Sequence, residues 1–377
     1  MDSMYAGLGN GAIQARRADV LVEIGTLEAK AQEYEAKAKS EQTRRLYAGD
    51  WRHFEQWCEW RGFLALPTSP ETLRLYIVDL AGTLKTNGEP AYKPATLTRK
   101  VSSITAINRD AGHHHRLART EEVSNVSKGI RRIRGTAQRR MHPLLLDDIK
   151  AILASMDYVR WPGGVTAFRD AFVLLAGFAG AFRRSEIASL QVRHVRFDRH
   201  DGLHIRLERS KTDQERTGAV IPLPFGTYPQ TCPVCAWVRW MRLVEAGSRG
   251  RPAAMKLILS TERWDRWEHV CRSPGQIDLD LETPLIRAVR KGGHIVAGGI
   301  SGDGLHAIVK RRAETVGFTG EIGFHSLRAG FVTQCRRNGV DARSIRLQTR
   351  HGSDAMIDIY DREYAPLAGN AVLKLGL

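Results

Sequence analysis

The stretch AFVLLAGFAGAF, residues 171–182, is the longest apolar run of the chain and the starting point for its fold. It is too short to cross a bilayer, and it is bracketed by the charged residues Arg169, Asp170, Arg183 and Arg184. A short apolar segment with charged flanks is typical of a helix buried in a protein core. We therefore expect a globular domain built around this helix.

Downstream of this helix the pattern changes to two strand-like runs. LHIRLERS begins at Leu203 and GAVIPLP at Gly218, and the polar piece between them, KTDQERT, is typical of a hairpin loop. The pattern then returns to helix up to the C-terminus, with GGHIVAGGISGDG, residues 292–304, as a loop. The sequence therefore predicts a mainly α fold with one small antiparallel β-sheet.

Upstream of the buried helix lies a second helical region. The segment that starts at residue 40 has apolar side chains at steps of three to four, the period of one buried helical face: Leu46, Tyr47, Trp51, Phe54 and Trp57. A further helix restarts after Pro70 with Glu71 in its first turn, and KPATLTRKVSSITAINRDAG is typical of another. We expect a small all-helical domain over roughly residues 40–130.

The chain is expected to have three parts. Residues 1–38 form an N-terminal extension, mobile or helical, and residues 39–138 form the helical domain, which ends in the basic run KGIRRIRGTAQRR. This run fits either a solvated linker or a strap that clamps phosphates. Residues 139–377 form the larger domain, with a C-terminal tail from about residue 366.

Composition narrows the class of partner. The formal net charge is +16 and the sequence pI is about 9.9, which favours nucleic acid over an anionic membrane surface as the polyanionic partner. The content of 42% hydrophobic residues argues against general disorder. The first twenty residues lack the apolar core of a signal peptide, and the five scattered cysteines favour a reducing compartment.

Several residues suggest metal binding or other functions that the rest of the sequence does not support. CPVC, Cys232–Cys235, has zinc-like spacing, but no second CxxC or HxxxH pair lies at a matching distance, and Pro233 suits a helix start. A metal is therefore not expected there. The histidines His113, His114 and His115 fit a position facing solvent or phosphate. No GxxxxGK[ST] loop is present, so ATP hydrolysis finds no support.

Four motifs occur in a telling order: GAFRRSEIASLQVRHV, SKT after a strand, HSLRAG, and RHGSDAMIDIY. Together they resemble the tyrosine recombinase (phage integrase) family, with the Cre-like branch closest in layout. The resemblance covers about residues 40–377. It implies an N-terminal core-binding domain that clamps DNA and a mostly helical catalytic domain with a small antiparallel sheet.

The resemblance also assigns site residues motif by motif. AFRRSEI matches the family's GLRxSEL, HSLR matches its HxxR box, and the family's nucleophile lies nine residues beyond the His/Trp position, here His351. The implied catalytic residues are Arg183, Lys211, His325, Arg328, His351 and Tyr360, with Glu186 bracing the site. Tyr364, one helical turn on, is the competing nucleophile or a core aromatic. Separately from the resemblance, the basic residues of the N-terminal helical region give the candidate DNA-binding set: Arg44, Arg45, Arg52, Lys100, Lys128, Arg131, Arg132 and Arg134.

These residue types suit metal-free cleavage of a phosphodiester. Arg183 and Arg328 would hold the non-bridging oxygens, Lys211 would protonate the leaving 5′-oxygen, and His325 would assist deprotonation of the tyrosine. The implied product is a 3′-phosphotyrosyl bond, formed without metal, ATP or cofactor. The family also implies a homotetramer on two double-stranded DNA sites, a Holliday junction, and a C-terminal tail exchanged between protomers. It implies a cytoplasmic, nucleoid-associated protein of a prokaryote, phage or mobile element, with no membrane partner.

Two departures and three alternatives stay open. Arg184 replaces the usual apolar residue beside the first arginine, and RHG stands where the family often has GHS. The same chemistry would serve a type IB topoisomerase or a hairpin telomere resolvase. The chain could also be a non-catalytic DNA-binding protein with a decayed site. The presence of a suitable residue at all six catalytic positions argues against this alternative.

Overall fold

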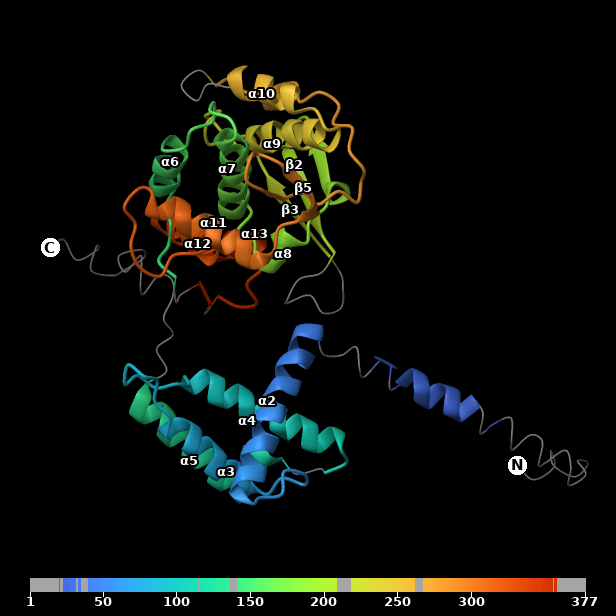
Figure 1. Ribbon diagram of the computed structural model, residues 1–377, viewed down its shortest axis with the longest axis vertical. Helices are drawn as coiled ribbons and strands as arrows, with labels where there is room; N and C mark the ends of the chain where they lie inside the picture. The colour runs from blue at the N-terminus through green and yellow to red at the C-terminus, as the bar shows by residue number, and fades with distance from the viewer. Residues whose placement is uncertain are drawn as a thin grey trace, which may run out of the picture. The chain divides into compact units, whose positions relative to one another are not determined.

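The structure is a computed structural model, and it describes residues 20, 23–31, 33–34, 40–113, 116–135, 141–208, 218–261, 267–354 and 356–357. The chain divides into two compact units, Met1–Gln138 and Arg139–Leu377 (Figure 1). Residues 23–31, ahead of the first packed helix, are helical and exposed.

The first unit is a bundle of four helices with one short 3₁₀ turn. Ser69 caps the second helix, accepting from the Thr72 N–H at 3.0 Å, and Pro70 opens it. Phe54, Tyr76 and Ile104 are fully buried where the helices meet. The elements are α2 (Glu41–Arg61), α3 (Pro70–Gly82), α4 (Pro94–Asp110), η1 (Leu117–Arg119) and α5 (Glu121–Arg134).

The buried face of α2 differs from the predicted one. Leu46 is 42% exposed, so its assignment to the core was wrong. Asp50, which the apolar pattern passes over, is buried and receives Lys100 Nζ at 3.3 Å, the Ser103 hydroxyl at 3.1 Å, and a guanidinium from α4, that of Arg99. The carboxylate tolerates burial because these partners supply charge and hydrogen bonds.

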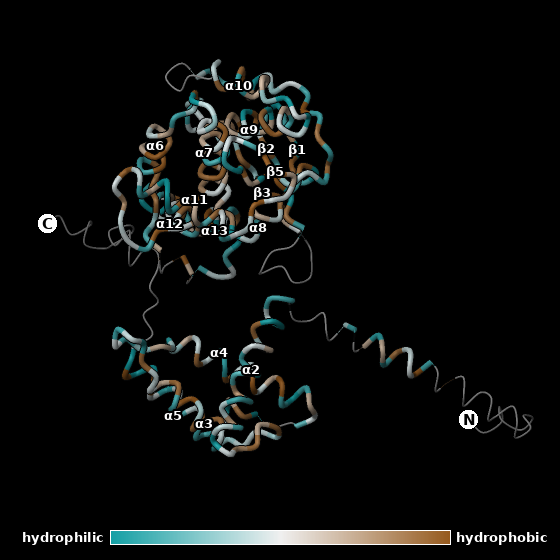
Figure 2. Tube along the Cα trace, in the orientation of Figure 1, coloured by the Kyte–Doolittle hydropathy of each residue, from teal (hydrophilic) through white to brown (hydrophobic). Residues whose placement is uncertain are grey.

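The second unit packs helices around a buried central helix, α7. Its helices are α6 (Leu146–Ala154), α7 (Gly163–Ala179), α8 (Arg184–Ala188), α9 (Pro233–Ser248), α10 (Pro252–Thr261), α11 (Gly302–Glu314), α12 (His325–Arg337) and α13 (Ala342–Thr349), with 3₁₀ turns η2 (Val192–His194) and η4 (Val270–Arg272). Almost every residue of α7 is buried, as predicted, and Figure 2 shows hydrophobic residues concentrated on α7 and the elements around it. None of the helices in the described ranges is long and apolar enough to span a membrane.

Two small antiparallel sheets complete the second unit. The first has the order β1-β2-β3, with β1 (Val195–Asp198), β2 (Gly202–Leu207) and β3 (Ala219–Leu223), and it contains the predicted hairpin. The second pairs β4 (Arg287–Val289) with β5 (Ile295–Gly299). The prediction of one sheet, with residues 292–304 as a loop, was therefore wrong, because β5 lies inside that glycine-rich stretch. The mainly α fold with small antiparallel sheets is confirmed.

Candidate active site

Arg183 lies just after a tight turn that ends the central helix. Ala181 in this turn has φ of 43°, in the left-handed region, and Arg183 is the N-cap of α8. The Glu186 carboxylate holds the arginine twice: Oε2 accepts from the backbone N–H at 2.8 Å and Oε1 from Nη1 at 2.7 Å. Glu186 is buried and therefore fixes the direction of the guanidinium.

Arg328 reaches the same turn from α12. Its side chain is 1% exposed, and Nη1 donates to the Ala181 carbonyl at 2.6 Å. The helix packs tightly against the start of the unit, because a Cβ added at Gly330 would lie 1.7 Å from the Leu144 carbonyl oxygen. The glycine of the HSLRAG motif is thus needed for close approach of two backbones.

Two histidines adjoin these arginines. His325 is the first residue of α12 and is exposed, and His351 follows α13 and is 6% exposed. Desolvation, followed by the positive charges of Arg328 and Arg183, lowers the pKa of His325. The same causes lower the pKa of His351 to about 3, so both rings are neutral at physiological pH.

The tautomer of His351 follows from its neighbour Thr349. The Thr349 hydroxyl donates its hydrogen to the Ile345 carbonyl at 2.8 Å, and it lies 2.9 Å from His351 Nδ1. Because that hydrogen is used, Nδ1 must carry the proton and donate to the hydroxyl oxygen. The lone pair of the ring is therefore on Nε2.

Arg350 is a site residue that motif matching did not select. It adopts φ of 58° at the end of α13, and Nη2 donates to Glu186 Oε2 at 2.8 Å. Its carbonyl accepts from Arg183 Nη2 at 3.2 Å. Burial alone would raise the pKa of Glu186, but the charge of Arg350 and the hydrogen bonds from Arg183 outweigh it and lower that pKa. The only signal in the sequence was the arginine of RHG at a position where the family often has glycine.

Of the predicted catalytic set, the structure brings together Arg183, His325, Arg328 and His351, with Glu186 between Arg183 and Arg350. Lys211 and Tyr360 lie outside the described residues, as do Tyr364 and the tail; β2 and β3 flank the segment that carries Lys211. Arg184, whose direction the sequence left open, points to α11 and pairs with Asp303 at 2.8 Å.

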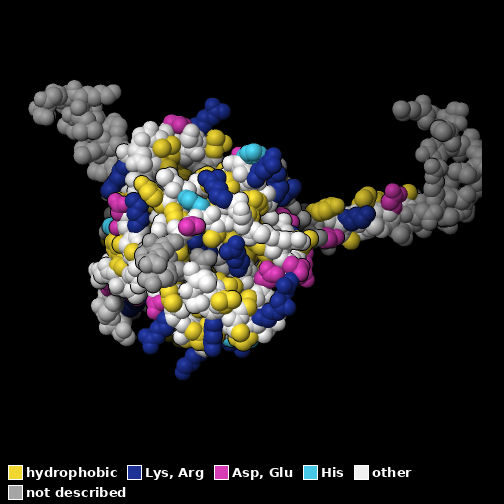
Figure 3. Space-filling view, turned by 90° about the horizontal axis from the view of Figure 1, so that it is seen from above, with side chains coloured by type: hydrophobic (Ala, Val, Ile, Leu, Met, Phe, Trp, Pro, Cys, Tyr) yellow, Lys and Arg dark blue, Asp and Glu magenta, His cyan; other side chains and the backbone are white. Residues whose placement is uncertain are grey.

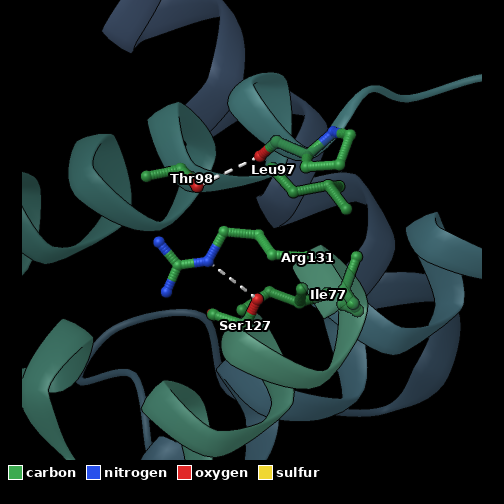
Figure 4. Close-up of a pocket in the computed structure, with 7 residues that line it drawn as sticks. Ile77, Leu97, Thr98, Ser127 and Arg131 are labelled. Carbon is green, nitrogen blue, oxygen red and sulfur yellow. Dashed lines mark hydrogen bonds between the residues drawn. The ribbon is translucent and has the colours of Figure 1, made fainter. Parts of the chain in front are cut away.

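The predicted DNA-binding residues of the first unit divide by exposure. Six members of the predicted set are exposed on α2 or α5: Arg44, Arg45, Arg52, Lys128, Arg131 and Arg132. The basic run up to Arg134 is not a linker, because it forms the last turns of α5. Arg131 lies in a small surface hollow between α3, α4 and α5, where Nε donates to the Ser127 carbonyl at 3.2 Å (Figure 4).

Two residues of that DNA-binding set have structural partners instead. Lys100 is 5% exposed and pairs with Asp50, so its assignment to the DNA-binding set was wrong. The Arg134 guanidinium donates to the Tyr92 carbonyl at 3.2 Å and to the Ala81 carbonyl at the end of α3. Its main role is therefore to cap that helix.

An open groove borders His351 on the second unit. It is lined by Arg343, Arg346 and Leu347 of α13 and by Asp354. The face of the molecule seen in Figure 3 carries Lys and Arg side chains interspersed with acidic and hydrophobic ones. Within the groove, Arg346 is paired with Asp354 at 3.0 Å.

The CPVC pair also differs from expectation. The sequence offered no second pair of ligands, but the structure places His269 and Cys271 beside Cys232 and Cys235. The argument against a metal site at CPVC, that no second pair of ligands is present, was therefore wrong. The second pair is His269 and Cys271, whose H-x-C spacing is unusual for a zinc site.

Comparison with known proteins supports the reading of the motifs. No family model matches the chain. An integrase/recombinase xerD homologue of Selenomonas ruminantium is 29% identical over 352 residues, which cover 93% of this chain and 89% of that protein. The Tn1549 transposon integrase in complex with transposon right end DNA has 11% identity and a TM-score of 0.53, covering 91% of this chain and 96% of that one. The same integrase in complex with circular intermediate DNA has 12% identity and a TM-score of 0.51, covering 88% and 92%.

The relative aligns along nearly the whole chain, and the two integrase structures share its fold. Within this chain, the fold brings the arginine, HxxR and RHG motifs to one place. The chain is therefore similar to the tyrosine recombinases, or phage integrases, in sequence along 93% of its length and in fold.

Proposed function

We propose that this protein cleaves and rejoins duplex DNA at specific sites through a covalent bond to Tyr360. The observation that carries the proposal is the convergence of Arg183 and Arg328 on the turn around Ala181, beside two neutral histidines. Arg350 adds a third guanidinium to a site whose acidic partner is Glu186. The surplus positive charge suits an anionic phosphodiester, and fixed guanidinium groups stabilise the charge that develops on its non-bridging oxygens.

The proposed cleavage is a transfer of the phosphoryl group from DNA to protein. The Tyr360 oxygen attacks phosphorus and forms the new P–O bond, while the bond from phosphorus to the 5′-oxygen breaks. Lys211 gives its proton to that leaving oxygen, and His325 takes the phenolic proton. Rejoining reverses these steps with a 5′-hydroxyl as the nucleophile.

The histidine environment fits this division of work. A base must be neutral before it accepts a proton, and the low pKa of His325 keeps it so at physiological pH. A tyrosine with a pKa of about 10 is a weak nucleophile at neutral pH, so it needs this help and the field of the arginines. The bond energy of the cut strand is kept in the phosphotyrosine, so ATP is not required, and the arginines and Lys211 take the place of a metal.

Recombination needs two sites and four protomers, and we extend the proposal to a tetramer that passes through a Holliday junction. The family's C-terminal segment inserts into a neighbouring protomer, and we assign that role to residues 367–377. Deleting the residues after Pro366 should leave single-site binding nearly intact while strand exchange fails. A truncated protein that recombines at the full-length rate would contradict the exchange but not the chemistry.

The direct test is trapping of the covalent intermediate. Sequencing the DNA that the purified protein protects would give the site, and a nicked suicide substrate built on it should accumulate a protein–DNA adduct. Tyr360→Phe should abolish the adduct and retain binding, and Tyr364→Phe, its neighbour one turn on, should retain both. Adducts with Tyr360→Phe but not with Tyr364→Phe would move the nucleophile. Relaxation of plasmids lacking the site at the same rate would favour the topoisomerase alternative.

A further inference from the structure

Four potential metal ligands meet away from the candidate active site. Cys232 is the N-cap of α9 and Cys235 lies in its first turn, while His269 and Cys271 come from the segment that contains η4. The cysteines are fully buried and His269 is half-buried. One ligand atom from each residue lies within 4.8 Å of the other three.

The distances between these atoms match a tetrahedral ion. Cys232 Sγ lies 4.0 Å from Cys271 Sγ, and His269 Nδ1 lies 3.5 Å from Cys235 Sγ and 3.6 Å from Cys271 Sγ. Zinc bonds of about 2.3 Å to sulfur and about 2.0 Å to nitrogen give tetrahedral edges of about 3.8 Å between sulfurs and about 3.5 Å between sulfur and nitrogen. The ligand atoms therefore already stand near the corners that zinc requires.

The surroundings prepare the ligands for a cation. Cys232 Sγ accepts from the Gly226 N–H at 3.2 Å and from the Cys235 N–H at 3.4 Å, and such donors stabilise a thiolate. His269 Nε2 lies 3.2 Å from the Thr227 carbonyl. A carbonyl only accepts, so Nε2 carries the hydrogen and Nδ1 turns its lone pair toward the cysteines, as a metal ligand must.

The backbone of the loop at Gly226 also fits a metal site. A Cβ added at Gly226 would lie 2.7 Å from the Cα of Cys232, so only glycine lets this loop bring its N–H to the sulfur. A disulfide does not account for the arrangement, because the 4.0 Å between Cys232 and Cys271 sulfurs is about twice a bonded distance. It would also leave Cys235 and the orientation of His269 unexplained.

We propose that Cys232, Cys235, His269 and Cys271 bind one zinc ion as a closed structural site. Four protein ligands fill the tetrahedron and leave no open position, so the ion acts on folding and not on the phosphodiester. It ties the loop after β3 and the start of α9 to the segment that contains η4. In Figure 1, α9 and α10 lie at the top of the second unit, whereas α8, α12 and α13 lie at its lower side.

Metal analysis of the full-length protein tests the site. Protein from cells grown with zinc and purified through EDTA should contain about one zinc ion per chain, because a buried site with three thiolates exchanges slowly. The paired variant Cys232→Ser/Cys271→Ser should fall below about a tenth of that content. Cys58→Ser is the matched control, since Cys58 is also a buried cysteine but lies in the first unit, and it should keep its zinc.

Cobalt provides a second readout that does not depend on how the variants fold. Wild-type protein expressed with cobalt in place of zinc should show the intense thiolate charge-transfer band and the visible bands of a tetrahedral centre. Wild-type protein with neither zinc nor these bands would overturn the proposal. So would zinc retained undiminished in the paired variant, or a disulfide between Cys232 and Cys271 found by mass spectrometry of the native protein.

Discussion

Arg350 and Arg183 share one carboxylate: Glu186 Oε2 accepts from Arg350 at 2.8 Å and Glu186 Oε1 accepts from Arg183 at 2.7 Å. Arg350 does this from a left-handed backbone conformation that an arginine adopts at a cost of about 1 kcal/mol. A glycine would suit that backbone better. The hydrogen bond of the Arg350 guanidinium must therefore add more stability than the backbone strain costs. We interpret Arg350 as a positioning residue for Arg183.

Replacing Arg350 separates the two effects. Arg350→Gly relieves the backbone but leaves Glu186 with one guanidinium fewer, so we expect the rate of adduct formation to fall roughly tenfold, or about 1.4 kcal/mol, with little change in DNA affinity. Single-turnover cleavage of the suicide substrate measures this rate. Arg184→Ala is the control, because Arg184 pairs with Asp303 on the surface and should leave the rate unchanged. A glycine variant as fast as wild type would remove Arg350 from the site.

Acid should destabilise the second unit through His351. The unfolded histidine binds a proton near pH 6.5, whereas the pKa of the folded ring is about 3. Between these values the unfolded state binds more protons, so the free energy of unfolding falls as pH falls, by about 1.4 kcal/mol per unit for one histidine. His325, whose pKa is also lowered, adds in the same direction.

Urea unfolding at several pH values from 7.5 downward measures that slope. His351→Gln removes the titrating group and keeps a polar side chain beside Thr349, so its stability should depend less steeply on pH than that of the wild type. Equal slopes in the two proteins would show that His351 is protonated as easily when folded as when unfolded.

The exposed end of α5 should contact the DNA backbone. Arg131→Gln/Arg132→Gln should weaken binding to all sequences alike and reduce the slope of log affinity against log salt by about 1.8, since each phosphate contact contributes about 0.9. Lys100→Met is the informative comparison, because Lys100 is buried against Asp50. It should lower the stability of the first unit and leave the salt slope as it is. An unchanged slope in the double variant would place the DNA elsewhere.

Cleavage should persist in excess EDTA, because arginines and Lys211 supply the positive charge at the phosphate. The proposed zinc site does not alter this expectation over a short assay, since its three cysteine ligands are buried. Activity lost in EDTA and restored by magnesium would contradict the mechanism. If only the Cys232→Ser/Cys271→Ser variant loses activity, and it also loses thermal stability, the loss of activity is due to misfolding.

The sequence predicts best where local patterns decide the structure. Pro70 and Glu71 predicted the start of α3, and the strand-like runs from Leu203 and Gly218 predicted the hairpin. Strand β5 was missed because its glycines have a low β propensity. Its pairing with β4 forms only in the folded domain and has no local sequence pattern. Lys100 was misassigned by charge, although its spacing from Leu97 and Ile104 puts it on the buried face of α4.

The site shows the same division. Ordered motifs indicate Arg183, His325, Arg328 and His351, which the fold then brings together. The partnership of Arg350 with Glu186 required the turn at Ala181, which no short motif encodes. The ligands His269 and Cys271 lie far from Cys232 along the chain, and only the packing of η4 against α9 reveals that they meet.

The described start of the second unit, residues 142–144, lies directly beside α12. The His142 N–H donates to the Glu321 carbonyl at 2.8 Å, and the Leu144 N–H donates to the Ser326 carbonyl at 3.0 Å, next to His325. Gly330 then allows α12 to rest on the Leu144 backbone without an intervening side chain. Backbone hydrogen bonds therefore join the start of the second unit directly to α12, so any shift of residues 142–144 is passed on to the helix that bears His325 and Arg328.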